Sequence, residues 1–384
     1  MNIIENLKTT ISEKVADAYF SAVDAGELPK SEADIKALIK LEIPKEKAHG
    51  DFASNLAMLF AKELRMPPRK IAEAIEAHIN KDSLIEKTEV AGAGFINFYL
   101  SNSWLYPVMQ HIEEMGKDYG KIDFGKGKKV MVEFVSANPT GPMHMGNARG
   151  GALGDCLASV LEYAGFEVTR EFYINDAGNQ IEKFGKSLEA RYIQLLKGED
   201  AIEFPEDGYH GDDITEHMRK FIELEGDKYL DVDTAERKKA LVAYALEKNI
   251  AYLKEDLGKY RIFYDVWFRE STLHESGAVK EVVEKLTENG YTYEKEGALW
   301  LNCVKMGLEK DEVLVRNNGI PTYFAADIAY HVNKLKDREF DLAIDVWGAD
   351  HHGHVARMKG AMAALGIDPD RFEVVLMKLV RLVR

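Results

Sequence analysis

The segment Asn138-Pro-Thr-Gly-Pro-Met-His-Met-Gly-Asn147 carries the residues best suited to chemistry. It lies between a predicted buried strand and a predicted helix, where α/β sheets bind ligands at the carboxyl ends of their strands. A helix N-terminus favours an anion, and phosphate is the natural candidate. His144 can donate to phosphate oxygens, Gly146 lets a flat base approach the backbone, and Asn147 adds a neutral donor. Taken alone, the segment could also be a Pro/Gly turn in which Asn147 only caps the helix.

Two other common nucleotide-binding patterns are absent from the sequence. There is no Gly-x-x-x-x-Gly-Lys-Ser/Thr, which argues against a P-loop. There is also no Gly-x-Gly-x-x-Gly, which argues against a dinucleotide-binding fold of the usual type.

Two carboxylates lie among apolar neighbours. Glu133 is in the run Val-Met-Val-Glu-Phe-Val, and Asp327 lies between Ala326 and Ile328. An unpaired carboxylate is costly in such surroundings, so each needs a cationic partner. For either residue alone, an internal salt bridge is the simpler interpretation. A guanidinium ligand is the functional alternative, because its paired N–H groups match a carboxylate in geometry as well as charge.

A second polar segment is Asp350-His351-His352-Gly353-His354. Adjacent histidines in a strand-to-helix loop point in different directions and no cysteine lies near, so zinc is disfavoured and we predict no bound metal. A second anion site at a helix start, with Asp350 on ribose hydroxyls, fits the segment better. The alternative is a helix cap at Asp350 with solvated histidines.

The predicted elements place both segments in one α/β fold. Short apolar strands are predicted over 130–135, 166–173, 340–347 and 371–380, with helices between them. We expect a Rossmann-like, doubly wound parallel sheet, split by a helical insertion and preceded by a small α+β domain. In that domain a helical stretch from Phe52 to Leu64 stops at Pro67, and Glu89–Leu100 alternates as strands do.

The expected domain boundaries follow from these patterns. We predict an N-terminal α+β domain at 1–115, a Gly/Lys linker at 116–129, and the first half of the Rossmann-like domain at 130–180. A mostly helical insertion follows at 181–297, and the second half occupies 298–384.

Composition sets limits on the function. The 384 residues carry a formal charge of −15, of which −11 falls between Gly198 and Glu236, so a polyanionic partner is neither required nor excluded. No apolar run approaches a membrane span, and the N-terminus is not a secretory signal. Two isolated cysteines cannot form a disulfide framework. We therefore expect a cytoplasmic protein without membrane partners.

The motifs together resemble a known family. His144-Met-Gly-Asn147 resembles the His-Ile-Gly-His signature of class I aminoacyl-tRNA synthetases, and Glu133–Gly150 resembles its arginyl-tRNA synthetase version. Further matches are Asn175–Gln180, Pro321–Tyr330 and Val346–His354, so that four motifs follow in order over about 220 residues. The N-terminal segment, with Gly50–Asn55 and Gly92–Leu100, resembles the family's extra domain, which contacts the tRNA elbow.

The resemblance implies an activity and a set of roles. The activity is ATP-dependent formation of arginyl-adenylate and transfer of arginine to the 3′ end of tRNA(Arg), with Mg²⁺ accompanying ATP. By resemblance, the catalytic residues are His144, Gly146 and Asn147. ATP binding is expected at Pro139, Thr140, Gly141, Pro142, His144, Gly146, Asn147, Asp350, His351 and His354. Arginine binding is expected at Glu133, Ser136, Asn138, Tyr323 and Asp327, with Ser136 and Asn138 on the amino and carboxylate groups. We expect a monomer.

Two departures from the family pattern leave alternatives open. The fourth signature position is Asn147 instead of histidine, and neither the Lys-Met-Ser-Lys signature nor an anticodon-binding domain is present before Arg384. We expect both to lie beyond Arg384, in which case this chain alone could be inactive. The alternatives are another nucleotidyltransferase with the same loop, and a non-catalytic tRNA-binding relative.

Overall fold

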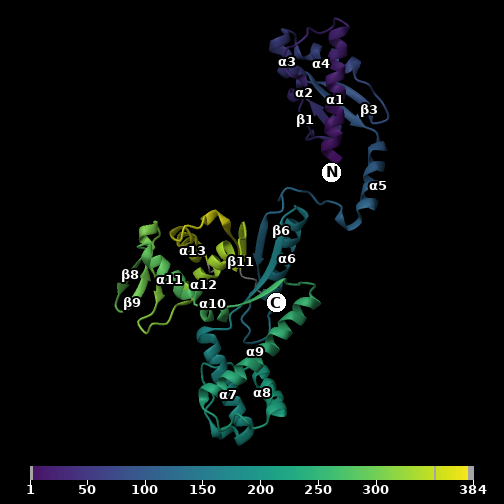
Figure 1. Ribbon diagram of the computed structural model, residues 1–384. Helices are drawn as coiled ribbons and strands as arrows, with labels where there is room; N and C mark the ends of the chain where they lie inside the picture. Colours follow the sequence, from purple (N-terminus) through teal and green to yellow (C-terminus); the bar gives the residue numbers. More distant parts are fainter. Residues whose placement is uncertain (1–2, 350–351, 379–384) are drawn as a thin grey trace. The chain divides into compact units, whose positions relative to one another are not determined.

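The computed structural model describes residues 3–349 and 352–378, and the chain divides into two compact units at residues 1–120 and 121–384 (Figure 1). The first unit packs helices on a four-stranded antiparallel sheet in the order β1-β2-β4-β3. Its elements are α1 (Ile3–Asp24), α2 (Ile35–Leu38), β1 (Leu41–Glu42), η1 (Lys47–His49), β2 (Phe52–Ser54), α3 (Leu56–Leu64), α4 (Pro68–His78), β3 (Ile85–Ala91), β4 (Phe95–Leu100), η2 (Asn102–Trp104), α5 (Leu105–Met115) and η3 (Gly116–Asp118).

One local prediction in this unit is wrong. Phe52 was expected to begin a helix, but it lies in β2, opposite Phe98 of β4. The helix α3 begins only at Leu56, whose amide donates to the Ser54 hydroxyl. Phe52 and Leu56 are both buried in the same core. Their spacing of four residues therefore matches that of a helix, although Phe52 is in a strand.

The second unit holds the parallel sheet. Its elements are β5 (Lys129–Glu133), α6 (Met145–Tyr163), β6 (Glu167–Ile174), α7 (Gly178–Lys197), η4 (Glu199–Ala201), α8 (Asp212–Glu225), α9 (Thr234–Lys259), β7 (Val266–Arg269), α10 (Ser271–Glu275), α11 (Ala278–Glu288), β8 (Thr292–Lys295), β9 (Ala298–Leu301), η5 (Val304–Met306), β10 (Glu312–Val315), α12 (Tyr323–Val332), the π-helical turn η6 (Asn333–Asp337), β11 (Leu342–Gly348), α13 (His352–Ala364), η8 (Pro369–Arg371) and β12 (Phe372–Met377).

Five parallel strands form the central sheet in the order β12-β11-β5-β6-β7. The chain runs outward from β5 through β6 to β7, and then from β11 to β12 on the other side. The strand order therefore reverses between β5 and β11, which is where sheets of this type bind ligands. This arrangement confirms the predicted α/β fold class with a doubly wound parallel sheet.

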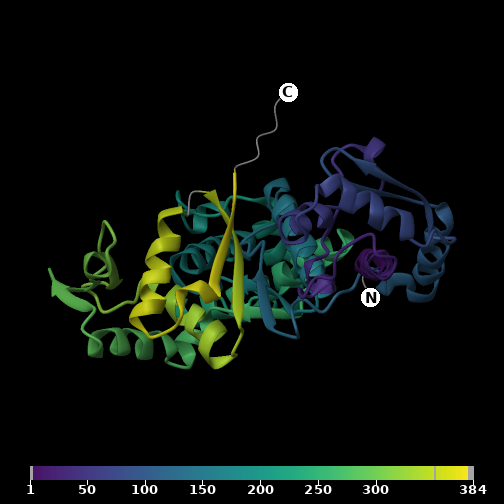
Figure 2. The same cartoon turned by 90° about the horizontal axis from the view of Figure 1, so that it is seen from above.

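Alternate residues of the strands serve the two faces of the sheet. Val130 and Val132 of β5 pack with buried residues of α6 and α9, including Ala158 and Ile250. The opposite face is covered by α12 and α13, with α11 packed against α12, and Figure 2 shows α13 beside the yellow strands β11 and β12. Because side chains alternate along a strand, Glu133 faces the α12 side.

Two features differ from the predicted insertion at 181–297. The strand β7 lies inside that range and pairs in parallel with β6, so the parallel sheet continues within it. It is only four residues long and none of its side chains is fully buried, which leaves a weak pattern in the sequence. The strands β8, β9 and β10 form a separate antiparallel sheet across the predicted boundary at residue 298.

The predicted linker is partly attached to the second unit. The amides of Ile122, Gly125 and Gly127 donate to carbonyls at the end of α6, from Tyr163 to Gly165. Among the described residues, no helix is both long and apolar enough to span a membrane.

Candidate active site

The loop after β5 has an unusual backbone. Val135 and Ser136 have positive φ angles, of 70° and 40°. A β-branched residue such as Val135 rarely adopts this conformation, which costs roughly 1–3 kcal/mol and persists only where the surroundings impose it. Val135 lines three adjoining cavities, so the strained backbone lies where they meet.

We name these cavities by their walls. The acidic pocket, of about 530 Å³, is lined by Glu133, Val135, Ser136, Tyr173, Asn175, Gln180, Glu270, Tyr323, Phe324, Asp327, Tyr330, Asp345, Val346, Trp347, Gly348 and His354. The helix-start pocket, of about 570 Å³, is lined by Val135, His144, Gly146, Asn147, Arg149, Gly150, Val346, Gly348, Ala349, Met377 and Lys378. The loop pocket, of about 420 Å³, is lined by Val135, Ser136, Ala137, Asn138, Thr140, Gly141, Pro142, His144, Asn147, Tyr209, Gly211 and Asp213.

The start of α6 is capped by its own side chains. Nδ1 of His144 accepts from the Gly146 amide at 3.1 Å, and Oδ1 of Asn147 accepts from the His144 amide at 3.0 Å. This reciprocal capping fixes the first turn of the helix. The capping interpretation of Asn147 therefore holds, while His144 and Asn147 also border both the helix-start and the loop pockets.

A row of carboxylates crosses the sheet beneath α12. Asp345 of β11, Glu133 of β5 and Glu171 of β6 are neighbours in register on three adjacent strands. Their exposed fractions are 1%, 7% and 0%. Three buried carboxylates side by side require compensating charge.

The segment 330–338 supplies that charge. Lys334 donates to Glu133 at 2.6 Å and to Asp345 at 2.8 Å. Arg338 forms a bidentate pair with Glu171, with distances of 3.0 and 2.6 Å. The hydroxyl of Tyr330 also donates to Glu171, at 2.6 Å. The row is thus held by two cations from the turn that follows α12 and the residue directly after it, Lys334 and Arg338.

Asp327 joins this network through His331. Nε2 of His331 lies 2.9 Å from Asp345, while its Nδ1 lies 2.8 Å from the backbone carbonyl oxygen of Asp327 and 3.2 Å from a carboxylate oxygen of the same residue. The second oxygen of Asp327 lies 2.5 Å from Nε2 of His354. Four carboxylates and the cationic side chains Lys334, Arg338 and His331 thus form one network. Asp327, with a side chain 26% exposed, is its least buried carboxylate and lines the acidic pocket.

Burial and these contacts shift the pKa values of the network. Burial and the nearby Lys334 act to lower the pKa of His331. The contacts with Asp327 and Asp345 outweigh both effects and raise this pKa to about 9. Burial raises the pKa of Asp327, yet His331 and His354 hold it well below its usual range. Burial raises the pKa of Glu133 despite the nearby Lys334. Asp327 therefore stays charged at neutral pH.

A further acidic side chain, Glu270, lines the other side of the acidic pocket. Glu270 follows β7 and is 3% exposed, and its amide donates to the Ile174 carbonyl. With the Asn175 amide turned so that its nitrogen donates, Asn175 lies 3.0 Å from a Glu270 oxygen. Burial raises the pKa of Glu270. Glu270 was not among the predicted site residues; its position directly after a parallel strand is the signal that could have revealed it.

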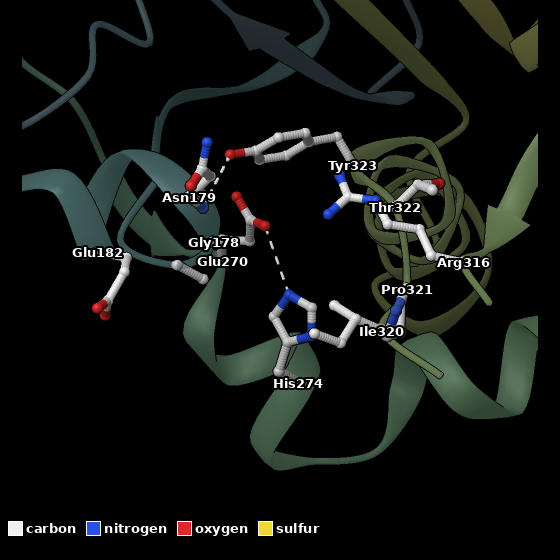
Figure 3. Close-up of a pocket in the computed structure, with 11 residues that line it drawn as sticks. Gly178, Asn179, Glu182, Glu270, His274, Arg316, Ile320, Pro321, Thr322 and Tyr323 are labelled. Carbon is white, nitrogen blue, oxygen red and sulfur yellow. Dashed lines mark hydrogen bonds and ion pairs between the residues drawn. The ribbon is translucent and has the colours of Figure 1, made fainter. Parts of the chain in front are cut away.

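A side pocket of about 370 Å³ adjoins the acidic pocket across two shared residues, Glu270 and Tyr323 (Figure 3). In Figure 3 the Tyr323 hydroxyl points toward Asn179, whose backbone N–H donates a hydrogen bond to it at 3.2 Å. The Glu270 carboxylate lies 3.4 Å from His274. The ring of Tyr323 thus separates two connected spaces.

The helical insertion contacts the loop after β5 through the buried side-chain amide of Asn249. Asn249 of α9 donates to the Pro139 carbonyl at 2.8 Å and lies 2.7 Å from His217 of α8. Tyr209 and Asp213, from the acidic part of the insertion, line the loop pocket. That part of the insertion therefore forms one wall of the site as well as a solvated surface.

The structure brings most predicted site residues to these pockets. Glu133, Ser136, Tyr323 and Asp327 line the acidic pocket, whereas Asn138 lines the loop pocket. Thr140, Gly141, Pro142, His144, Gly146 and Asn147 line the loop or helix-start pockets. Pro139 is buried and lines none of the three. His354, expected at ATP, lines the acidic pocket and contacts Asp327. Asp350 and His351 lie outside the described residues.

Two family models match the chain. One, described as "Arginyl tRNA synthetase N terminal domain", matches residues 5–100. The other, described as "tRNA synthetases class I (R), catalytic domain", matches residues 109–379.

Curated proteins and solved structures agree with these matches. The chain is 59% identical to an arginine–tRNA ligase of Acetivibrio thermocellus and 61% identical to one of Ruminiclostridium cellulolyticum, in each case over the whole chain and 68% of the relative. The chain thus spans about two thirds of the length of these relatives. A structure of a candidate arginyl-tRNA synthetase from Campylobacter jejuni has a TM-score of 0.66 at 35% identity, covering 73% of this chain and 61% of its own. The Thermus thermophilus arginyl-tRNA synthetase shares the fold, with a TM-score of 0.58 at 22% identity over 97% of this chain and 66% of its own.

Proposed function

The chain belongs to the arginyl-tRNA synthetase family, and on that premise we propose that its acidic pocket holds L-arginine for attachment to tRNA(Arg). The reaction of the family charges tRNA with arginine and uses ATP. The arginine carboxylate attacks the α-phosphate of ATP, giving arginyl-adenylate and pyrophosphate. The arginyl group then passes to a ribose hydroxyl of the terminal adenosine of the tRNA, and AMP leaves. Such phosphoryl chemistry depends mainly on positioning and charge stabilisation.

The charged carboxylate of Asp327, which lines the acidic pocket and has a pKa well below its usual range, is the observation that supports an arginine pocket. Tyr323 and Asp327 lie one helical turn apart on α12, so their side chains share a face. A guanidinium is always charged and donates in a planar fork, which suits a carboxylate with an aromatic ring beside it. The guanidinium would pair with the Asp327 carboxylate from the open side of the pocket. We propose that Glu133 and Glu270 border it from the other walls of the pocket.

The remaining predicted arginine contacts lie nearer the loop. The Ser136 hydroxyl donates to Glu133 at 2.8 Å and accepts from the Tyr173 amide at 3.2 Å. Ser136 lines both the acidic and the loop pockets, and Asn138 lines the loop pocket. We propose that these two residues hold the amino and carboxylate groups of arginine, which must lie toward ATP for the attack.

ATP is proposed to bind around the start of α6. The dipole of this helix favours phosphate at its N-terminus, and His144 and Asn147 lie at both adjoining pockets. Gly146 and Gly150 line the helix-start pocket, where the absence of side chains leaves room for a flat base. Mg²⁺ enters with ATP as part of the substrate. The predicted ATP contacts at Pro139, Asp350 and His351 stay predictions, and for His354 we propose a role at Asp327 instead.

The tRNA end needs a route to the arginyl carboxylate. The side pocket adjoins the acidic pocket across Tyr323 and Glu270 and is bordered by Asn179, Arg316 and His274 (Figure 3). These polar groups and the aromatic ring suit a nucleoside. We propose that the terminal adenosine approaches there, and that residues 5–100 contact the tRNA elsewhere.

We also propose that the protein is a monomer. A cytoplasmic location is proposed because charged tRNA supplies protein synthesis there.

The test of the function is amino-acid-dependent exchange of pyrophosphate into ATP, measured with tRNA(Arg) and each of the standard amino acids in turn. We expect exchange with arginine and none with lysine or glutamate. Exchange with a different amino acid, and none with arginine, would contradict the assignment.

A further inference from the structure

Lys334 occupies an unusual position for a lysine. Its exposed fraction is 0%, and its ammonium lies 4.1 Å from the centre of the Tyr330 ring. It belongs to the π-helical turn η6, a rare backbone form that often marks functional sites. The charge is retained only because two carboxylates contact it directly, since a buried ammonium is otherwise costly.

Two chains of contacts lead from Lys334 to the acidic pocket. The first is direct, through Glu133 and then Ser136. The second runs through Asp345 and His331 to Asp327, and every link is a direct contact of 3.2 Å or less. Lys334 and His331 do not line the pocket. Neither can touch a ligand there, so any influence they have must act through the carboxylates.

We propose that Lys334 is a positioning residue for arginine recognition, which holds Glu133 and Asp345 apart as charged groups and, through Asp345 and His331, fixes the carboxylate of Asp327. The proposal rests on the proposed function, because it presumes that the acidic pocket binds arginine. It adds that the selectivity of the pocket for a charged side chain depends on residues behind its wall.

Removing the ammonium has a defined physical consequence. Glu133 and Asp345 are neighbours in register, and without Lys334 they would be two buried carboxylates with no cation between them. Such a pair takes up a proton or moves apart, because burial disfavours two adjacent negative charges. Either response shifts Asp345, which contacts His331, and so disturbs the orientation of Asp327.

The experiment compares Lys334→Met with Lys336→Met in the full chain. Methionine keeps much of the lysine length without its charge, and Lys336 is an exposed lysine in the same turn, which makes it the matched control. Calorimetry would give the dissociation constants of arginine, citrulline and ATP. We expect Lys334→Met to raise the dissociation constant of arginine by at least about tenfold. The dissociation constants of citrulline and ATP should change less than about threefold. Lys336→Met should bind all three ligands as the unaltered chain does.

The comparison with citrulline separates positioning from simple damage. A distorted fold weakens arginine, citrulline and ATP together, whereas loss of a positioned charge lowers only the preference for arginine. Urea unfolding checks that the variants are folded. If Lys334→Met does not fold, His331→Leu tests the same path, because it breaks the contact between Asp345 and Asp327 while Lys334 keeps both partners.

The outcomes distinguish the two proposals. An unchanged arginine constant in a folded Lys334→Met or His331→Leu chain, or an equal loss for arginine and citrulline, would overturn the positioning role and leave the arginine pocket standing. If the unaltered chain binds no arginine, the proposed function fails and this inference fails with it.

Discussion

Replacing Asp327 by asparagine removes the charged carboxylate that lines the acidic pocket and is open to a ligand there. Asparagine keeps the shape of the side chain, and its oxygen can still accept from His354, so the pocket should keep its form. What is lost is the charged hydrogen bond to a guanidinium, worth about 1.5–3 kcal/mol. That corresponds to a rise of about 10- to 150-fold in the dissociation constant of arginine.

Calorimetry with arginine and with ATP on Asp327→Asn would measure this loss. The binding of ATP should be nearly unchanged, because Asp327 lies outside the helix-start and loop pockets. Asp337→Asn is the matched control, since Asp337 is exposed at the end of the turn that follows α12. A folded Asp327→Asn chain that binds arginine as tightly as the unaltered chain would refute the charge argument.

Three further outcomes are expected. Glu133→Gln should weaken arginine binding by more than about 1.5 kcal/mol, measured by calorimetry, and equal affinity would remove Glu133 from the pocket. The pKa of His331 is raised to about 9, so its charge stabilises the fold below pH 6.5. That stabilisation is lost as the pH rises through 9. In urea unfolding, the unaltered chain should therefore lose on the order of 3 kcal/mol of unfolding free energy between pH 6.5 and 9, compared with His331→Gln. Gly154→Ala should destabilise the fold by about 1–3 kcal/mol in urea, because its new Cβ would lie 2.1 Å from the Phe134 ring, while Gly353→Ala, with open space around it, should not.

The parts of the fold that rest on local pattern could be predicted from the sequence. The strand β5, the loop 136–144 and the helix α6 follow from an apolar run, a cluster of Pro and Gly, and a helical repeat. The same holds for β11 and the helix after it. The candidate site could be placed because parallel strands put the residues after their carboxyl ends together.

The parts that rest on long-range contacts could not. Two ion pairs of the site join residues far apart in the sequence, and no local pattern links them. Glu171 and Arg338 are 167 positions apart, and Glu133 and Lys334 are 201 positions apart. Lys334 reads as one of several lysines in a charged segment, although it is fully buried. Glu270 is not identified from the sequence, because the short strand β7 is not recognised in it. Without that strand, nothing in the sequence indicates that Glu270 lies at the carboxyl edge of the sheet, where the pocket is.

The central claim is that the acidic pocket selects a charged guanidinium, and thermal unfolding of this chain with added ligands tests it most directly. Arginine at about 100 times its dissociation constant should stabilise the fold by roughly 2.7 kcal/mol. Citrulline has the same shape without the charge and should do little, and lysine should do less than arginine because it lacks the planar fork. ATP, titrated separately, should stabilise the chain through the other pockets. A stabilisation by citrulline equal to that by arginine would contradict the account.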